Sequence, residues 1–306
     1  MSAALIAVDW GTTNFRAYLL DRNGSILERV SDRRGILNVA DGDFAAAYLE
    51  LVGDWQVSAD GPPAVMAGMI GSRNGWVEAP YVDCPTDPAA LAGNLTPVPM
   101  ADGRALWVVP GLACRNDGVY DVIRGEETQI AGAIARAGAT GVSAVYCMPG
   151  THCKWVRVCD GTIAGFRTAM TGEVFSVLRD HSILGRLMAE ETGASLGPAF
   201  EKGLDRARDA GGLLHHLFGV RAEVLSGVLA DAAVADYLSG ILIGHEVRDL
   251  GAGEAVTLVG SESLNERYRR ALTHYGHAVD ILSGEDAVVA GLWAVARQAG
   301  IVEEDV

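Results

Sequence analysis

Two short turns rich in glycine and threonine are the first candidates for chemistry in this chain of 306 residues. The first, Gly11-Thr12-Thr13, follows Asp9 at the end of an apolar run, and the second, Gly150-Thr151, precedes Lys154. Glycine lets the backbone approach an oxygen closely, and successive N–H groups can form an anion-binding nest. Threonine hydroxyls add donors, so both turns are candidate phosphate-binding turns, although ordinary hairpins favour the same residues.

Asp9 and Lys154 carry the charges that a phosphate site uses. Asp9 ends a predicted strand and could hold a hydrated Mg²⁺, which prefers oxygen ligands. Lys154 is one of two lysines, against 22 arginines, and it is equally a phosphate-binding point charge or a solvated strand end. The sequence contains no GxxxxGK[ST] motif, so a Walker-type loop is excluded.

A pair of acidic residues is the candidate for acid–base chemistry. Glu126 and Glu127 open a predicted helix rich in alanine and glycine. Either carboxylate could accept a proton from a substrate hydroxyl during phosphoryl transfer, or both could simply complement the helix dipole. Neighbouring helical residues point about 100° apart, so only one of the two can face a bound substrate.

The hydrophobic pattern that must position these residues predicts two β-meanders, each followed by helices and further strands. In the first half we expect strands over 3–8, 15–19, 25–30 and 64–70, with a helix over 43–55 between the last two. In the second half we expect strands over 143–148, 154–158, 162–169, 256–259 and 279–282. A helical block over 172–250, with helices starting near residues 173, 198 and 225, and two helices over 263–275 and 286–298 complete it. This pattern predicts an α/β architecture with an internal duplication, in which the two Gly-Thr turns occupy matching positions.

Composition excludes several classes of function. With 24 Lys+Arg and 39 Asp+Glu the net charge is −15, which disfavours nucleic-acid and membrane-surface partners. No apolar run approaches the ~20 residues of a membrane span, and the N-terminus has no basic region typical of a signal peptide. We therefore expect a cytoplasmic protein. The five cysteines form no CxxC pair and the histidines are scattered, so neither a disulfide framework nor a zinc site is predicted.

Four motifs in a fixed order give the chain a resemblance to a known superfamily. They are Asp9-x-Gly-Thr-Thr-x-x-Arg16, Gly125-Glu126, Gly150-Thr151 and a strand ending in Gly260-Ser261. Their order is similar to the first phosphate motif, connecting helix, second phosphate motif and adenosine motif of the actin, sugar-kinase and Hsp70 superfamily. Longer segments resemble the 2-dehydro-3-deoxygalactonokinase family; they are 68–76, 124–129, 149–155, 166–173 and 181–186.

The resemblance implies an α/β, two-domain, duplicated ribonuclease H-like (actin/hexokinase-like ATPase) fold with a cleft between the domains. Residues 1–115 are expected to form the N-terminal domain, with the first phosphate turn and the sugar-acid site. Residues 116–306, with a helical insert at about 172–250, are expected to hold the second phosphate turn and adenosine. The implied activity is phosphorylation of 2-dehydro-3-deoxy-D-galactonate at the 6-hydroxyl with ATP and Mg²⁺, in bacterial galactonate catabolism.

Carried over residue by residue, the resemblance assigns expected roles. Asp9 is the magnesium-side carboxylate, and Glu126 is the base where related kinases have aspartate, with Glu127 as the alternative. The expected ATP-binding residues are Gly11, Thr12, Thr13, Gly150, Thr151, Lys154, Gly260 and Ser261. The expected substrate-binding residues are Arg73, Asn74, Trp76 and Arg16, with Arg73 as the cation for the substrate carboxylate.

Other functions stay open on the sequence alone. A kinase of the same fold could act on 2-dehydro-3-deoxy-gluconate or on a neutral or amino hexose. A nucleotide-driven assembly or chaperone-like ATPase is the alternative from a different class. The helical block over 172–250 could also supply the interface of a homo-oligomer.

Overall fold

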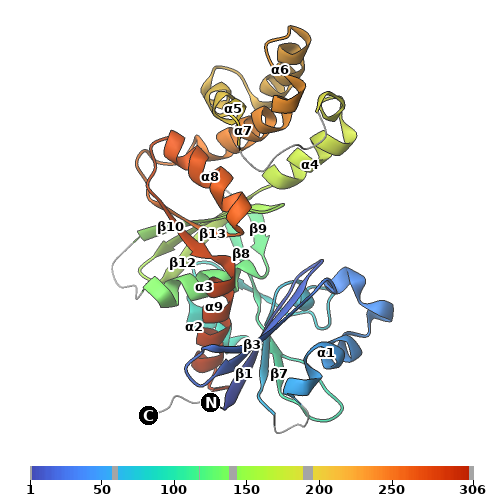
Figure 1. Cartoon of the computed structure of the whole chain (residues 1–306). Coiled ribbons are helices and arrows are strands. Elements are labelled where there is room, and N and C mark those ends of the chain that lie inside the picture. Colours follow the sequence, from blue (N-terminus) through green and yellow to red (C-terminus); the bar gives the residue numbers. More distant parts are fainter. Residues whose placement is uncertain (1, 57–60, 117, 138–142, 189–195, 303–306) are drawn as a thin grey trace. The chain divides into compact units, whose positions relative to one another are not determined.

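The chain begins with the antiparallel meander that its sequence predicts. The computed structural model describes residues 2–56, 61–116, 118–137, 143–188 and 196–302. β1 (Ala3–Trp10), β2 (Phe15–Asp21) and β3 (Ile26–Asp32) form the meander. β4 (Ala64–Ala67) and β7 (Leu106–Val108) then add parallel strands, and β6 (Thr96–Pro97) pairs antiparallel with β7. The strand order is β3-β2-β1-β4-β7-β6 (Figure 1).

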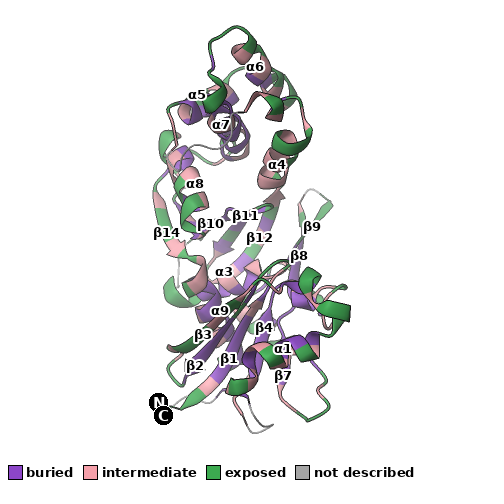
Figure 2. Ribbon diagram, turned by 45° about the vertical axis from the view of Figure 1, so that its right-hand side comes forward, coloured by how far each residue is buried: buried purple, intermediate pink, exposed green. Residues whose placement is uncertain are grey.

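Apolar side chains bury this sheet. Residues 5–8 of β1 and all of β4 are buried, as Figure 2 shows, because both strands are continuous apolar runs. Helix α1 (Phe44–Val52) packs into the same core and begins at Asp43, whose carboxylate accepts the Ala46 N–H at 3.0 Å. The predicted helix is confirmed, with Asp43 as its N-cap.

The second sheet repeats the topology of the first. β10 (Ser143–Met148), β11 (Cys153–Cys159), β12 (Thr162–Ala169), β13 (Val256–Gly260) and β14 (Val279–Ser283) have the order β12-β11-β10-β13-β14. β10 pairs in parallel with β13, as β1 pairs with β4. The predicted α/β class with a duplicated mixed sheet is confirmed.

A third, small sheet contains the predicted domain boundary, because residues 115 and 116 both lie in one of its strands. β5 (Tyr81–Asp83), β8 (Gly111–Asn116) and β9 (Val119–Ile123) form it, with β8 in the middle. The chain divides into two compact units. The first unit comprises residues 1–143, 156–167 and 282–306, and the second unit comprises residues 144–155 and 168–281. The predicted domains, 1–115 and 116–306, stay a prediction.

Two helices of the first unit approach each other unusually closely. α3 (Glu126–Ala137) and α9 (Gly284–Gln298) cross at Gly132 and Gly291. A Cβ atom at Gly132 would overlap the carbonyl of Ala287, and one at Gly291 would overlap the carbonyl of Thr128. Only glycine permits this contact, which fixes α3 against α9.

The described residues of the helical block form four α-helices. They are α4 (Thr171–His181), α5 (Ala199–Arg208), α6 (Leu213–Leu225) and α7 (Val234–Val247). The expectation of a helix starting near Leu225 is wrong, because α6 ends there and Gly227 has φ +74°, a helix-terminating conformation. The predicted starts near residues 173 and 198 agree with α4 and α5 within two residues.

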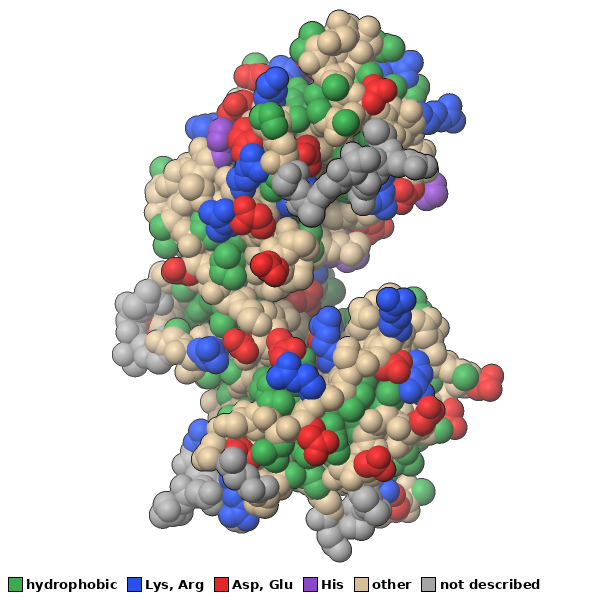
Figure 3. All heavy atoms as spheres, in the orientation of Figure 1, with side chains coloured by type: hydrophobic (Ala, Val, Ile, Leu, Met, Phe, Trp, Pro, Cys, Tyr) green, Lys and Arg blue, Asp and Glu red, His purple; other side chains and the backbone are tan. Residues whose placement is uncertain are grey.

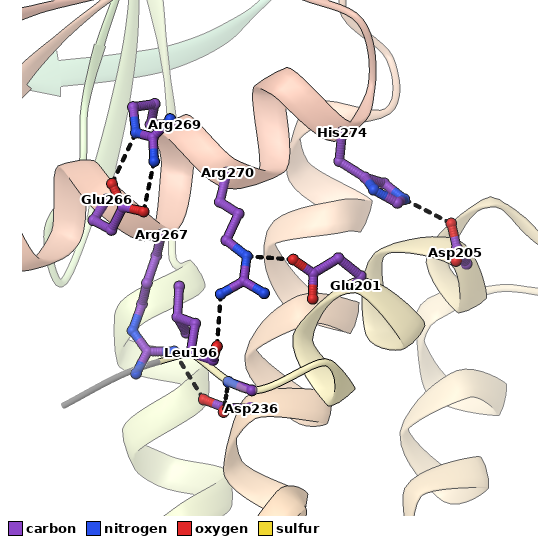
Figure 4. A network of polar contacts seen from close by, with 10 residues as sticks. Leu196, Glu201, Asp205, Asp236, Glu266, Arg267, Arg269, Arg270 and His274 are labelled. Carbon is purple, nitrogen blue, oxygen red and sulfur yellow. Dashed lines mark hydrogen bonds and ion pairs between the residues drawn. The ribbon is translucent and has the colours of Figure 1, made fainter. Parts of the chain in front are cut away.

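Ion pairs attach α8 (Glu262–His274) to this block, as Figure 4 shows. Arg270 pairs with Glu201 and also donates to the Leu196 carbonyl at 2.7 Å. Arg267 lies 3.4 Å from Asp236, and His274 lies 2.7 Å from Asp205. These contacts connect α8 with α5 and α7 inside the second unit.

Candidate active site

Asp9 lies near the end of β1, opposite Arg16 on β2 in the strand register. Its carboxylate is 3.6 Å from the Arg16 guanidinium, and a quarter of the Asp9 side chain is exposed. Burial raises the pKa of Asp9, Arg16 opposes the rise and the nearby Glu126 adds to it. A carboxylate in this setting is stabilised by a bound cation, because the cation restores its charged form.

The first Gly-Thr turn, Gly11-Thr12-Thr13, is held in place through its carbonyl groups. The carbonyls of Gly11 and Thr12 accept N–H groups of Ile36 at 3.0 Å and Leu37 at 3.2 Å. The Thr12 and Thr13 N–H groups, on exposed residues, donate to no acceptor in the part of the chain that the structure describes. A Cβ at Gly35 would lie 2.3 Å from the Thr13 nitrogen, so the turn packs on Gly35 while its two N–H groups keep the donor capacity that an anion-binding nest uses.

Two glycines from the resembling segments, to which the sequence assigns no role of their own, complete this site. Gly68, directly after β4, has φ +97°, and a Cβ there would lie 2.8 Å from the Trp10 carbonyl and 3.4 Å from the Asp9 carboxylate. Gly125, directly before α3, has φ +109°, and its Cβ would lie 3.2 Å from the Gly68 Cα. β4 consequently ends three residues earlier than predicted, and the N-terminus of α3 lies beside Asp9. Gly68 lies inside the apolar run 64–70 and Gly125 directly precedes the acidic pair, so no local signal shows that the two glycines meet.

Glu126 and Glu127 differ sharply in their surroundings. Glu126 is partly exposed, and its carboxylate accepts the Arg124 N–H at 3.2 Å. Glu127 is fully buried and accepts the Gly125 N–H at 2.6 Å and the Thr128 hydroxyl at 3.1 Å. Burial, with a further contribution from Glu126, raises the pKa of Glu127 to about 7. Of the two carboxylates, Glu126 is the one that a bound molecule can reach.

The loop after β4 presents two polar side chains. Arg73 and Asn74 are exposed, and Arg73 makes no ion pair or hydrogen bond with any described residue, Glu78 included. Trp76 is partly buried instead, with its ring 6.3 Å from Trp10 and 5.9 Å from Tyr48. Because Trp76 packs on the core, its expected role in binding the sugar acid stays a prediction.

Arg124 is a cation of this region that the sequence reasoning passed over. Its guanidinium donates to the Ala79 carbonyl at 2.8 Å and lies over the Tyr81 ring at 4.4 Å. Its Nε and Nη1 atoms are buried and have no partner among the described residues. These contacts join the residue before Gly125 to the loop that carries Arg73.

The second phosphate turn lies between β10 and β11, in the second unit. A Cβ at Gly172 would overlap the Gly150 carbonyl, and the Glu173 N–H donates to the Thr151 carbonyl at 2.9 Å. The start of α4 therefore packs directly on the turn. Lys154 is buried and donates to the His152 carbonyl at 2.8 Å, so the alternative of a solvated strand end is wrong.

Other residues of the second unit surround this turn. Gly260 ends β13, where a Cβ would lie 3.6 Å from the Pro149 carbonyl, and Ser261 stands at the N-cap of α8. Glu246 of α7 accepts hydrogen bonds from the Trp155 indole at 2.6 Å, the Tyr268 hydroxyl at 2.8 Å and the Thr171 hydroxyl. One carboxylate thus connects β11, α4, α7 and α8. No motif in the sequence indicated it.

The described residues contain neither a cluster of metal ligands nor a membrane-spanning helix. None of their His, Cys, Asp and Glu side chains form a group of three or more that could hold a metal ion. The five cysteines are free thiols. No helix in the described ranges is long and apolar enough to cross a membrane.

Comparisons with known proteins agree over the whole chain. The model of the family described as 2-keto-3-deoxy-galactonokinase matches residues 9–295. The 2-dehydro-3-deoxygalactonokinase of Escherichia coli (strain K12) is 40% identical over 302 residues, covering 97% of this chain and 99% of the relative. DgoK1 of Rhizobium meliloti (strain 1021) is 41% identical over 302 residues, covering 95% and 96%.

A solved structure shows that the similarity extends from the sequence to the fold. The crystal structure of a Sinorhizobium meliloti protein with the same kinase name has a TM-score of 0.88 and 37% identity, and covers 96% of this chain and 98% of that chain. The expected resemblance is thus confirmed in sequence and in fold. The chain belongs to the 2-keto-3-deoxy-galactonokinase family, a family of carbohydrate kinases.

Proposed function

We propose that this protein transfers the γ-phosphoryl group of ATP to the 6-hydroxyl of 2-dehydro-3-deoxy-D-galactonate, with Mg²⁺, giving the 6-phosphate and ADP. The observation that carries the proposal is the meeting of Asp9, Gly68 and the start of α3 beside a turn whose Thr12 and Thr13 N–H groups have no acceptor among the described residues. Phosphoryl transfer needs these parts: donors for the phosphate charge, a carboxylate for the metal and a base for the hydroxyl.

In this proposal Glu126 is the base. The 6-hydroxyl proton passes to its carboxylate while the oxygen bonds to the γ-phosphorus and the bond to the ADP oxygen breaks. Glu127 is the positioning residue, because it holds the Gly125 N–H. The buried Glu127 is also a second acidic group close to the partly exposed Glu126, and such a neighbour favours protonation of the site during transfer.

The metal and nucleotide are assigned to the residues that fit them. Asp9 would hold Mg²⁺ through water, which suits an ion that retains several waters and is bound by few carboxylates. When bound, the ion would neutralise charge on the transferring phosphate. In the predicted N-terminal domain, residues 1–115, the phosphate groups would be bound by Gly11, Thr12 and Thr13. The residues assigned to ATP in 116–306 are Gly150, Thr151, Lys154, Gly260 and Ser261.

The sugar acid is assigned to the loop after β4. Arg73, exposed and without a partner among the described residues, is available for the substrate carboxylate, while Asn74 and Arg16 are exposed donors for hydroxyls. Trp76 is assigned to the wall of this site. Arg73→Lys keeps the charge and loses the planar fork, so the KM for the sugar acid should rise while the KM for ATP stays nearly constant. A substrate reduced at C1 should not respond to the substitution; an equal response would remove Arg73 from carboxylate binding.

A coupled assay of ADP release tests the activity itself. The purified protein is offered ATP and Mg²⁺ with 2-dehydro-3-deoxy-galactonate, its C4 epimer 2-dehydro-3-deoxy-gluconate, or a neutral or amino hexose. The highest kcat/KM is expected with the galactonate. A preference for either of the other substrates would replace the assignment, and ATP-dependent light scattering without sugar would favour an assembly ATPase.

A further inference from the structure

Glu246 of α7 accepts three hydrogen bonds at a partly buried place in the second unit. One carboxylate oxygen, Oε1, accepts the Trp155 indole N–H at 2.6 Å. The other, Oε2, accepts the Tyr268 hydroxyl at 2.8 Å and the Thr171 hydroxyl. Hydrogen bonds to a charged acceptor are roughly twice as strong as neutral ones, so this carboxylate holds its three partners firmly.

Tyr268 remains a donor to this carboxylate near neutral pH. Its side chain is buried. Burial above all, with contributions from Cys153 and Glu246, raises the pKa of Tyr268 well above its ordinary value. The hydroxyl therefore keeps its proton, and the hydrogen bond to Glu246 does not change over the pH range of a kinase assay.

Two of the three partners belong to segments that carry residues assigned to ATP. Trp155 directly follows Lys154 on β11, and Lys154 donates to the carbonyl of the turn residue His152 at 2.8 Å. Tyr268 lies on α8, whose N-cap residue is Ser261. The carboxylate of α7 thus joins the start of β11 to α8.

Thr171, the third partner, opens α4 and so connects the carboxylate to the second phosphate turn. Gly172 follows it, and a Cβ there would overlap the Gly150 carbonyl. The Glu173 N–H donates to the Thr151 carbonyl at 2.9 Å. The first turn of α4 therefore supports the Gly-Thr turn, and in a closely packed interior a shift of Thr171 is passed on to it.

Glu266 of α8 shows a different kind of carboxylate contact in the same unit. Figure 3 shows acidic (red) and basic (blue) side chains next to each other on the surface. Glu266 pairs with Arg269 of the same helix at 2.7 Å, and both side chains are about half exposed (Figure 4). A surface pair within one helix contributes little. Glu246 differs because its three partners come from three different elements.

We propose that Glu246 is a positioning residue for nucleotide binding, because it fixes Trp155, α4 and α8 relative to one another and so holds the second phosphate turn where it can bind ATP. The inference rests on the proposed function, in which this turn, Lys154 and Ser261 bind ATP. Glu246 itself is assigned no contact with the nucleotide and acts through its three partners.

Nucleotide binding in the absence of sugar acid tests the proposal directly. Isothermal titration calorimetry of the full chain with Mg²⁺ and the non-hydrolysable analogue β,γ-imido-ATP gives the Kd. Thr171→Val keeps the shape and removes the hydroxyl, so the Kd should rise about 10-fold, as when a residue that orients a ligand-binding group is lost. Thr171→Ser keeps the hydroxyl and should bind like the wild type. Circular dichroism checks that each variant is folded.

A pair of tyrosines separates positioning from stability. Tyr268→Phe removes a hydroxyl that donates to Glu246, and the matched control Tyr275→Phe removes one that donates to the Leu204 carbonyl at 2.7 Å in the same unit. Each variant loses one hydrogen bond, so the urea midpoint should fall in both. Only Tyr268→Phe should also weaken binding of the analogue, by the same factor as Thr171→Val.

Steady-state kinetics of Glu246→Gln give a second measurement. The amide has a single acceptor oxygen, so it cannot accept from the indole and the two hydroxyls together. The KM for ATP should rise about 10-fold, while the KM for the sugar acid stays nearly constant. The matched control Glu266→Gln should change neither. A purely structural role would instead lower kcat through loss of folded protein, with both KM values unchanged.

The outcomes separate this proposal from the proposed function. Unchanged nucleotide binding in Glu246→Gln and Tyr268→Phe, or equal weakening in Glu266→Gln and Tyr275→Phe, would overturn the positioning role alone. A wild type that binds the analogue but phosphorylates no sugar acid would overturn the proposed function and leave the positioning role in place. A wild type that does not bind the analogue would overturn both.

Discussion

Replacing the buried Glu127 with glutamine should change how stability depends on pH. The Glu127 carboxyl has no exposed surface, and its pKa is raised from an ordinary 4.5 to about 7, by burial first and by Glu126 second. Glutamine has nearly the same shape, keeps an oxygen for the Gly125 N–H and carries no charge. Glu127→Gln therefore removes the cost of a buried negative charge and little else.

The sign of the effect follows from proton binding. Between pH 4.5 and 7 the folded chain keeps the Glu127 proton while the unfolded chain releases it, so the free energy of unfolding of the wild type falls as pH rises. This loss of unfolding free energy is absent below pH 4.5 and complete above pH 7. A difference of about 2.5 pKa units corresponds to about 3 kcal/mol. Glu127→Gln should thus gain up to about 3 kcal/mol over the wild type between pH 5 and pH 8.

Urea unfolding followed by tryptophan fluorescence measures this difference. Trp10, Trp55, Trp76, Trp107 and Trp293 lie in the first unit, with α3, and only Trp155 lies in the second. The signal therefore reports mainly on the unit that contains Glu127. If the stability difference between variant and wild type is the same at pH 5 and pH 8, or larger at pH 5, Glu127 is not a buried acid with a raised pKa.

Three further predictions concern the same unit. Glu126→Gln should lower kcat by about 10²–10⁴-fold, the contribution of a general base, with little change in the KM for ATP. Steady-state kinetics of Glu126→Gln and Glu127→Gln are compared, and a larger loss of kcat in Glu127→Gln would make Glu127 the base instead. Asp9→Asn should lower kcat severely with an unchanged circular dichroism spectrum; near-normal turnover would remove Asp9 from the site. Gly291→Ala should lower the free energy of unfolding by about 1–3 kcal/mol through overlap with the Thr128 carbonyl, whereas Gly53→Ala, at φ −55° with open space around it, should be nearly neutral in the same urea titration.

The strands and most helices could be predicted because each element has a local signal. β1, β10 and β12 are bounded by Gly, Asn or Asp turns, and their predicted starts are confirmed. The early end of β4 could not be predicted, because residues 64–70 are continuously apolar and only the contact of Gly68 with Trp10 turns the chain. Likewise the sequence around Leu225 favours a helix start, whereas the positive φ of Gly227, which ends α6, is visible only in the structure.

The site was predictable where its residues belong to one turn and not where distant segments meet. Gly11-Thr12-Thr13 and Asp9 share a turn, so spacing alone selected them. The exposure of Glu126 and burial of Glu127 depend on how α3 packs on α9, which no local pattern records. Glu246 is 91 residues from Trp155, its indole partner, and nothing near it in the sequence indicates hydrogen bonding.

The glycine contact between α3 and α9 also constrains the order of events during synthesis. α3 ends at Ala137 and α9 begins at Gly284, so a ribosome adding 5–20 residues per second needs on the order of ten seconds to make the chain between them. During that time the apolar face of α3 around Gly132 has no partner helix on the nascent chain. The helix that carries Glu126 can therefore reach its final position only after the second sheet and the helical block have been translated.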